Sequence, residues 1–300
     1  MITYSVVIST YNRANLLRQC LDALSNQSVP VSAYEIIVIN DGSADNTAEI
    51  VRDCQTHHPD LNIVYKKQTN GGPSKGRNAG IALAKGDIIF FTDDDCIVPK
   101  RWIETLAEGY KKHPDVAGVG GLYVFPDYIK NNFIFAEYHL FKMRNAWYGL
   151  CGLNHEIKTS AYSKNPAGNT SNMSYIKDVF ESLGGFDENL TRPGFDDTEL
   201  RKRVMDSGRI LLYIPYHVIH LHPMGSFSAI KRFFIFGRGR YYFSKKGNDL
   251  KKHYPSLAWL NESIQKHPDW KPHFKALAYI DLLITTGGWC FEAIVRKFNS

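Results

Sequence analysis

The sequence predicts an α/β fold: a mostly parallel sheet flanked by helices, followed by a helical C-terminal extension. Two observations predict it. Short, nearly continuous apolar runs alternate with segments of helical spacing in the first third of the chain, and strands of this kind are buried on both faces of a helix-covered parallel sheet. From Ser226 onward the pattern is mainly helical. With 44% hydrophobic and 22% charged residues among 300, the chain has the composition of a globular protein with a substantial core.

The first part of the chain is expected to alternate strands with helices. β-Branched apolar runs bounded by polar residues predict the strands, and apolar residues three or four positions apart predict the helices. Ser43 is the expected N-cap of the second helix, and Pro73 begins the third after a glycine turn. The expected strands are 4–10, 34–41, 61–67 and 87–92, and the expected helices are 14–27, 43–57 and one from Pro73.

The second part is less regular. A helix is expected after Pro99, with Trp102, Ile103 and Leu106 facing inward. Residues 125–168 are aromatic and show no clear period, so no element is predicted for them. The remaining expected elements are a strand at 116–124, a helix opened by Asp196 and Asp197, and two short strands around Pro215 within 209–223.

Charge is unevenly distributed along the chain. The formal net charge is +6, and residues 226–300 hold 13 Lys and Arg against 5 Asp and Glu, so residues 1–225 carry a net −2. A basic, aromatic tail fits a solvated helical face, an anionic membrane surface or nucleic acid. The first ten residues are typical of a strand rather than of a signal segment. The five scattered cysteines have no metal-type spacing, which favours reduced thiols and a cytoplasmic location.

Acidic residues follow two of the predicted strands. Asp41 ends the second strand, and Asp93, Asp94 and Asp95 follow the fourth. The carboxyl ends of parallel strands meet at one edge of a sheet, where such folds bind ligands. Alone, an acidic triplet also fits a polar turn. Together with the second acidic position, it favours a divalent cation that is bound with substrate phosphates.

The stretch "NGGPSKGRNAG" at 70–80 reads as a glycine turn followed by the start of a helix, and it brings basic residues to the same edge. The free backbone N–H groups of a helix start, together with Lys75 and Arg77, suit phosphate oxygens. By itself this signal is weak, because an ordinary loop before a helix has the same composition.

Four stretches, in order, carry a resemblance to a known family. They read "VVISTYNRANLLRQCLDAL", "EIIVINDGSADNT", "GGPSKGRNAGIALAKGDIIFFTDDD" and "GGFDENLTRPGFDDTEL". Together they resemble family-2 glycosyltransferases of the GT-A fold, from about residue 4 to residue 222. The resemblance implies a nucleotide-sugar donor, a divalent metal (Mn²⁺ or Mg²⁺) and inversion at the anomeric carbon. It also implies bacterial polysaccharide biosynthesis at the cell envelope.

The resemblance implies specific roles for individual residues. A UDP-sugar is the expected donor, with guanosine and thymidine nucleotides left open. Residues that match the family's donor contacts are Thr10, Tyr11, Arg13, Asp41, Arg77, Asn78, Asp93 and Asp94. Residues that match its metal site are Asp95, Asp93 and, as in some members, His220.

The resemblance also supplies the catalytic base. In the family it lies in a Glu-Asp or Asp-Asp pair at a helix start, which matches Asp196 and Asp197 here. Asp197 is the expected base and Asp196 the second choice. Such a carboxylate accepts the proton of the attacking hydroxyl. Without the resemblance, the pair also fits a helix N-terminus that is favoured by negative charge.

A sequence motif of the processive family members is not found, and this favours one kind of transfer over another. The Gln-x-x-Arg-Trp motif of processive members does not occur, which favours transfer of a single sugar to a glycan acceptor, lipid-linked or a cell-surface polysaccharide precursor. The competing functions are a sugar-phosphate nucleotidyltransferase, whose glycine-rich loop after the first strand is not found, and a non-catalytic nucleotide-sugar-binding protein. Nucleic acid is not an expected partner.

The expected domains follow from the same resemblance. Residues 1–225 form the catalytic domain, with a nucleotide-sugar-binding half at 1–124 and an acceptor-binding half at 125–225. Residues 226–300 form a basic, aromatic helical region. The stretch 274–298 approaches the ~20 apolar residues of a membrane span, but it contains Asp281 and Glu292. We therefore expect a surface helix that contacts the inner face of the membrane, or one that packs on the catalytic domain or on a second subunit.

Overall fold

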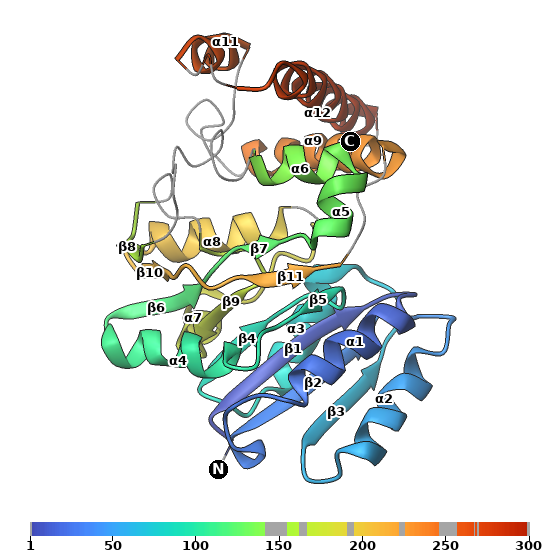
Figure 1. Ribbon diagram of the computed structural model, residues 1–300, viewed down its shortest axis with the longest axis vertical. Helices are drawn as coiled ribbons and strands as arrows, with labels where there is room; N and C mark the ends of the chain where they lie inside the picture. The colour runs from blue at the N-terminus through green and yellow to red at the C-terminus, as the bar shows by residue number, and fades with distance from the viewer. Residues whose placement is uncertain are drawn as a thin grey trace. The chain divides into compact units, whose positions relative to one another are not determined.

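The computed structural model describes residues 2–141, 155–161, 167–190, 195–221, 226–245, 257–266, 268 and 270–298 (Figure 1). These residues divide into two compact units. The described parts of Met1–Pro126, Gly152–Thr191 and Asp196–His222 form unit 1, and the described parts of the remaining segments form unit 2. The boundary expected at 225/226 stays a prediction. In the structure, helices from the 127–141 segment cluster with the C-terminal helices in unit 2.

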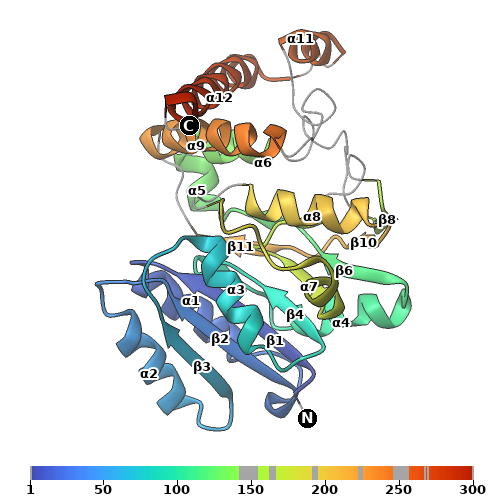
Figure 2. The same cartoon turned by 180° about the vertical axis from the view of Figure 1, so that it is seen from behind.

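Unit 1 is built on an eight-stranded sheet of order β3-β2-β1-β4-β9-β6-β10-β8. Its first four strands are parallel. Right-handed crossovers place α1 and α2 on one face and α3 on the other (Figures 1 and 2). The elements are β1 (Tyr4–Thr10), α1 (Ala14–Leu24), a 3₁₀ turn (Val31–Ala33), β2 (Tyr34–Asn40), α2 (Thr47–His57), β3 (Asn62–Lys67), α3 (Pro73–Leu83) and β4 (Ile88–Phe91).

The second half of the sheet mixes strand directions. β9 runs antiparallel between β4 and β6, β10 is parallel to β6, and β8 is antiparallel to β10. The elements are α4 (Trp102–Lys112), β6 (Val116–Gly120), β8 (Ile157–Thr159), β9 (Met173–Ile176), α7 (Asp178–Leu183), α8 (Asp196–Asp206) and β10 (Ile210–Tyr213). The sequence prediction of a mostly parallel, helix-flanked sheet is confirmed.

A small second sheet, β5-β11-β7, connects the acidic triplet to His220. Its strands are β5 (Cys96–Ile97), β7 (Tyr123–Val124) and β11 (Val218–His220). The triplet lies in the short connection from β4 to β5. β11 pairs antiparallel with β5, and His220 stands opposite Cys96 in this register. The pairing therefore brings a histidine from the far end of unit 1 beside the acidic residues.

Helix α3 packs directly against β1 because two of its residues have no side chain. A Cβ atom on Gly76 would lie 2.0 Å from Ser9 Oγ, and one on Gly80 would lie 2.3 Å from Val7 Cγ1. Both distances are far below van der Waals contact, so only glycine permits this approach. The helix start, with Gly72 at φ +88°, is thereby held at the carboxyl edge of the sheet beside the acidic triplet.

Most predicted elements are confirmed, and two expectations are wrong. The strand at 116–124 is two strands in different sheets, because the chain turns at Gly121, where a Cβ would lie 2.1 Å from the Tyr216 carbonyl oxygen. Ser43 does not cap α2, which begins at Thr47; the Ser43 hydroxyl accepts a hydrogen bond from the Asn12 N–H instead. The segment without a period contains α5 (Asp127–Asn132), α6 (Ile134–Phe141) and β8.

Unit 2 consists of helices in its described part. Besides α5 and α6 it contains α9 (Ser226–Lys245), α11 (Leu257–Lys266) and α12 (Pro272–Phe298). Tyr138, Phe233, Phe274 and Leu277 form its buried apolar cluster. α12 runs along α9, and Gly288 permits the contact, because a Cβ there would lie 2.1 Å from the Phe234 carbonyl oxygen.

The acidic residues of α12 face inward. Asp281 accepts a hydrogen bond from Tyr138 Oη at 3.2 Å, and Glu292 pairs with Arg238 of α9. Both are nearly inaccessible to solvent. By length and composition, Pro272–Val295 is the one described helix that could cross a membrane. The two acids therefore lie on the buried side of the helix, and the expected surface helix stays a prediction.

Candidate active site

The acidic triplet is largely buried and neutralised from two sides. Asp94 and Asp95 are buried, whereas the Asp93 side chain is 27% exposed. Arg13 Nη1 lies 3.0 Å from Asp94 Oδ1 and 2.9 Å from Asp95 Oδ2. The Thr10 hydroxyl donates to Asp94 Oδ2 at 2.7 Å. Burial raises the pKa of Asp94 to about 7, although the charge of Arg13 acts to lower it.

The Asp93 carboxylate is held ionised. Burial alone would raise its pKa, but the charge of Arg77 and a hydrogen bond from Ser171 keep that pKa below the usual value. Arg77 Nη2 lies 2.9 Å from Asp93 Oδ1, and Ser171 Oγ donates to Oδ2 at 2.7 Å. Ser171 comes from the loop before β9, so the antiparallel central strand contributes directly to the site.

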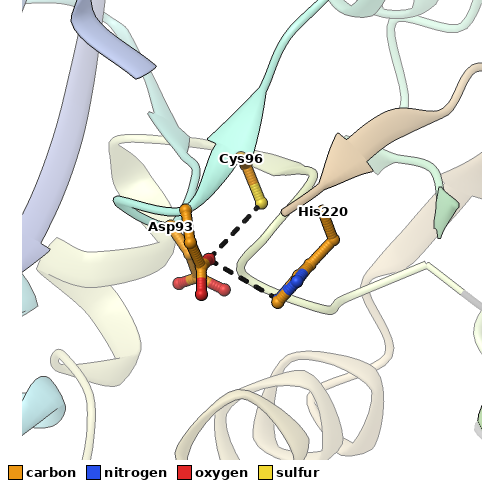
Figure 3. Close-up of side chains that lie close together, drawn as sticks. Asp93, Cys96 and His220 are labelled. Atoms are coloured by element: carbon orange, nitrogen blue, oxygen red, sulfur yellow. Dashed lines mark hydrogen bonds and ion pairs between the residues drawn. The ribbon is translucent and has the colours of Figure 1, made fainter. Parts of the chain in front are cut away.

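His220, Cys96 and Asp93 converge (Figure 3), and the Asp95 carboxylate belongs to the same cluster. One ligand atom from each of the four residues lies within 4.8 Å of every other. His220 Nε2 is 3.5 Å from Asp95 Oδ1. The His220 ring is fixed by Tyr123, whose ring centroid is 4.9 Å away, and by Phe125 at 5.5 Å. The aromatic packing aims the imidazole at the acids.

Arg77 links the triplet to the acidic pair at the start of α8. Its side chain is 11% exposed and makes ion pairs with both Asp93 and Asp196. Its guanidinium also lies over the Phe186 ring, 5.5 Å from the centroid. A planar guanidinium presents several donors in a fixed arrangement, so the two acidic groups from opposite ends of unit 1 are held at one place.

Asp197 is the less buried member of the α8 pair. Its Oδ1 accepts a hydrogen bond from the Thr198 N–H at 2.6 Å. Burial and then the neighbouring charge of Asp196 raise the pKa of Asp197 to about 6, with Arg77 acting in the opposite direction. A carboxylate with this pKa is ionised near neutral pH and still basic enough to take a proton.

The profile of the family described as "Glycosyl transferase family 2" matches residues 5–182. This chain belongs to glycosyltransferase family 2. Glycosyltransferase AglE of Haloferax volcanii is 32% identical over 239 residues, which are 79% of this chain and 72% of that protein. Glucosyl-dolichyl phosphate glucuronosyltransferase of the same organism is 29% identical over 196 residues, 63% of this chain and 58% of that protein.

Two solved structures share the fold of this glycosyltransferase. One is mannosyltransferase PcManGT from Pyrobaculum calidifontis in complex with GDP-Man and Mn²⁺. It is 21% identical, the match covers 97% of this chain and 75% of that chain, and the TM-score is 0.60. The other is S. aureus TarS 1–349 in complex with UDP-GlcNAc, which is 16% identical, with 99% of this chain and 92% of that chain covered and a TM-score of 0.57. The fold is therefore GT-A-like, and this family-2 enzyme transfers a sugar from a nucleotide sugar.

The predicted site residues of this glycosyltransferase fall into two groups. Those brought together are Thr10, Arg13, Arg77, Asp93, Asp94, Asp95, Asp196 and His220. Asp41 is bound to the same edge through its backbone, because its N–H donates to the Thr10 carbonyl oxygen at 2.9 Å, and its carboxylate accepts hydrogen bonds from Gln68, Gly71 and Gly72. Tyr11 is half exposed. The individual roles that the resemblance implies stay predictions.

The side chain of Asn78 is hydrogen-bonded to the loop that follows α7. Its side-chain amide donates to the Phe186 carbonyl oxygen and to Glu188, and its Oδ1 accepts the Phe186 N–H at 2.7 Å. It thus fixes the loop after α7 against α3. Its expected place beside the donor diphosphate stays a prediction.

Two residues of the family-2 site were missed by sequence reasoning. Ser171 has no local signal, because its contact with Asp93 is created by the pairing of β9 with β4. Cys96 directly follows the triplet, which was a usable signal, but the scattered cysteines showed no metal-type spacing. His220, the remaining member of the cluster, comes from β11, far along the chain.

The donor set fits a divalent cation. Two carboxylates and an imidazole suit Mn²⁺, and carboxylates with substrate phosphates suit Mg²⁺. Among the described residues, Arg13 pairs with Asp94 and Asp95, and Arg77 pairs with Asp93 and Asp196. Asp93, Asp95 and His220 would hold the cation.

Proposed function

We propose that this enzyme moves a single sugar from a nucleotide-diphosphate sugar to an acceptor hydroxyl, with inversion, by metal-assisted direct displacement. One observation carries the proposal. Arg77 binds Asp93 of the triplet and Asp196 of the α8 pair at the same time. A direct displacement needs a cationic environment for the leaving group and a base for the incoming hydroxyl within one small space. Because Arg77 pairs with both Asp93 and Asp196, the triplet that would receive the leaving group and the α8 pair that would supply the base lie on either side of one guanidinium.

Asp197 is the base in this proposal. It is the neighbour of Asp196, which Arg77 neutralises, and its pKa of about 6 leaves it ionised near pH 7. Asp197 accepts the proton from the acceptor hydroxyl as the oxygen attacks the anomeric carbon. Asp196 stays paired with Arg77 and holds the guanidinium beside the leaving group. This division of roles favours Asp197 over Asp196.

The triplet and its partners receive the donor diphosphate. When bound at Asp93, Asp95 and His220, a divalent cation supplies positive charge opposite the leaving diphosphate. Arg13 is 39% exposed at its side chain, so its guanidinium is accessible to donor phosphates as well as to Asp94 and Asp95. Asp94 is buried, and its raised pKa of about 7 limits the negative charge of the triplet.

A UDP-sugar is the proposed donor. The two solved relatives are complexes with GDP-Man and with UDP-GlcNAc, so both bases occur within the fold. The test is a panel of UDP-, GDP- and dTDP-sugars, scored by the shift in melting temperature with Mn²⁺, with Mg²⁺ and with EDTA. Stabilisation by one donor class that disappears with EDTA supports the proposal. Equal stabilisation in EDTA contradicts the metal site, and failure of every donor contradicts the function.

The proposed acceptor is a lipid-linked glycan or a polysaccharide precursor at the cytoplasmic face of the membrane. One relative is named for transfer to a dolichyl phosphate-linked glucose. Support within this chain comes from α12, whose solvent-exposed residues between 276 and 294 are all uncharged. They are Ala276, Tyr279, Ile280, Leu283, Thr286, Gly287, Cys290, Phe291 and Ile294. We name this surface the α12 stripe.

The α12 stripe and the charge of its region together fit an anionic membrane surface. The stripe extends about 27 Å along the helix, and Leu283, its most prominent member, is 73% exposed. Residues 226–300 carry 13 basic against 5 acidic residues. An uncharged face in a basic region is the pattern of a helix that lies in the headgroup layer. We propose that this helix brings the enzyme to membrane-bound acceptors.

A further inference from the structure

Cys96 lies among the proposed metal ligands. It stands opposite His220 in the β5–β11 register, where side chains on one face are direct neighbours. Its Sγ is 3.9 Å from Asp95 Oδ1, the same oxygen that lies 3.5 Å from His220 Nε2. The thiol and the imidazole point toward the acidic group from two different strands (Figure 3).

The resulting donor set has one nitrogen, two oxygens and one sulfur. Mg²⁺ and Mn²⁺ prefer oxygen donors, whereas Zn²⁺ binds thiolate, imidazole and carboxylate in four-coordinate tetrahedral sites. Tetrahedral zinc sites with bonds of about 2.0–2.3 Å have ligand atoms roughly 3.3–3.8 Å apart. The four ligand atoms here lie within 4.8 Å of one another, so a contraction of at most about 1.0–1.5 Å would close them around a zinc ion.

We propose that Cys96 is a fourth ligand that closes this site around Zn²⁺ and makes Zn²⁺ an inhibitor of the enzyme. Mn²⁺ and Mg²⁺ bind Asp93, Asp95 and His220 and leave the thiol protonated. Zn²⁺ binds the thiolate as well, and the thiol proton passes to the buffer without any change in oxidation state. A closed four-ligand site has no open position for a diphosphate oxygen. The inference rests on the metal site of the proposed function.

A second buried thiol provides a matched control. Cys20 Sγ lies 3.5 Å from the Asp93 backbone carbonyl oxygen, but Cys20 is not a member of the four-residue cluster. Both thiols are buried beside the same acidic triplet. Cys20→Ser therefore changes a neighbouring thiol without removing a proposed ligand, whereas Cys96→Ser removes the ligand.

The first test is spectroscopic and needs no variant. The full-length chain is stripped of metal with EDTA, dialysed and titrated with Co²⁺, a visible probe for zinc sites. We expect a thiolate-to-cobalt charge-transfer band, which Zn²⁺ abolishes and which is absent in Cys96→Ser but kept in Cys20→Ser. Cobalt binding without that band would overturn the role of Cys96 even if the variants fail to fold.

The second test compares affinities. Zn²⁺ and Mn²⁺ dissociation constants are measured by competition with a chromophoric chelator and by Mn²⁺ electron paramagnetic resonance. Cys96→Ser should weaken Zn²⁺ binding by about tenfold or more and leave Mn²⁺ binding within about threefold. Equal weakening of both metals would contradict the inference. Absence of binding by any metal would instead overturn the metal site of the proposed function, so the two failures are distinct.

Discussion

The carboxylates of Asp93 and Asp196 share one guanidinium, that of Arg77. Asp93 follows a strand of the parallel half of the sheet, whereas Asp196 opens α8 in the second half. Neither acid is near the other in sequence, and both would repel each other without the intervening cation. The pairing makes the donor side and the acceptor side of the proposed reaction one electrostatic unit, in which Asp197 is the adjacent carboxylate.

Asp197→Asn should abolish transfer while donor binding is retained. The amide keeps the shape of the side chain but cannot accept the proton, and a general base contributes about 10²–10⁴-fold to the rate. Single-turnover rates and the donor dissociation constant measure the two effects separately. Asp206→Asn, an exposed aspartate at the other end of α8 that pairs with Lys202, is the control and should transfer at the normal rate. Normal turnover by Asp197→Asn would assign the base to another residue.

The pH profile should report the raised pKa of Asp197. The base acts as the carboxylate, so activity is complete above the folded-state pKa and is lost as the pH falls through about 6. An unperturbed aspartate would keep its activity down to about pH 4. The measurement is kcat/KM for the donor between pH 5 and 8 at saturating metal. A profile that stays flat down to pH 5 would contradict the assignment.

Much of the fold could be predicted because its strands have a sequence pattern that is contained within the strand itself. The run from Tyr4 to Thr10 was expected with the bounds that the structure shows, since an apolar β-branched segment between polar residues needs no distant information. The break at Gly121 could not be predicted. It depends on the close approach of the Tyr216 carbonyl oxygen, which exists only once β10 and β11 are in place.

The candidate site follows the same distinction. The triplet and the α8 pair were visible because each is a compact acidic motif in a recognisable context. The contact of Ser171 with Asp93 comes from strand pairing between distant segments, so no local pattern contains it. Cys96 directly follows the triplet, but its place beside His220 comes from the pairing of β5 with β11. Asp41 shows a third case: its position at a strand end was predictable, but its hydrogen bonds to Gly71 and Gly72 depend on how the following loop folds back.

Arg77→Gln should destabilise the protein as well as impair transfer. Removing the guanidinium leaves Asp93 and Asp196 without their shared partner, and breaking a buried ion pair in this way typically costs about 3–5 kcal/mol. Arg18→Gln is the matched control, because Arg18 pairs with Asp53 on the exposed surface, where a pair contributes roughly 0–1 kcal/mol. Urea unfolding of both variants gives the comparison. If both variants lose the same small amount of unfolding free energy, Arg77 does not hold the two acids together.

Substitution in the α12 stripe should release the enzyme from anionic vesicles. Leu283→Glu places a charge at the most exposed apolar position of the stripe, and loss of one buried leucine weakens partitioning by about 1.5–3 kcal/mol, roughly tenfold or more. Leu257→Glu on α11, which is 57% exposed but outside the stripe, is the control and should bind normally. Vesicle co-sedimentation at low and high salt measures both variants.

Because the basic charge of the region also contributes, binding by the unaltered chain should weaken as salt rises. Failure of the unaltered chain to bind anionic vesicles at low salt would remove the membrane role, whereas resistance to salt and alkali would mean that α12 crosses the bilayer instead of lying on it.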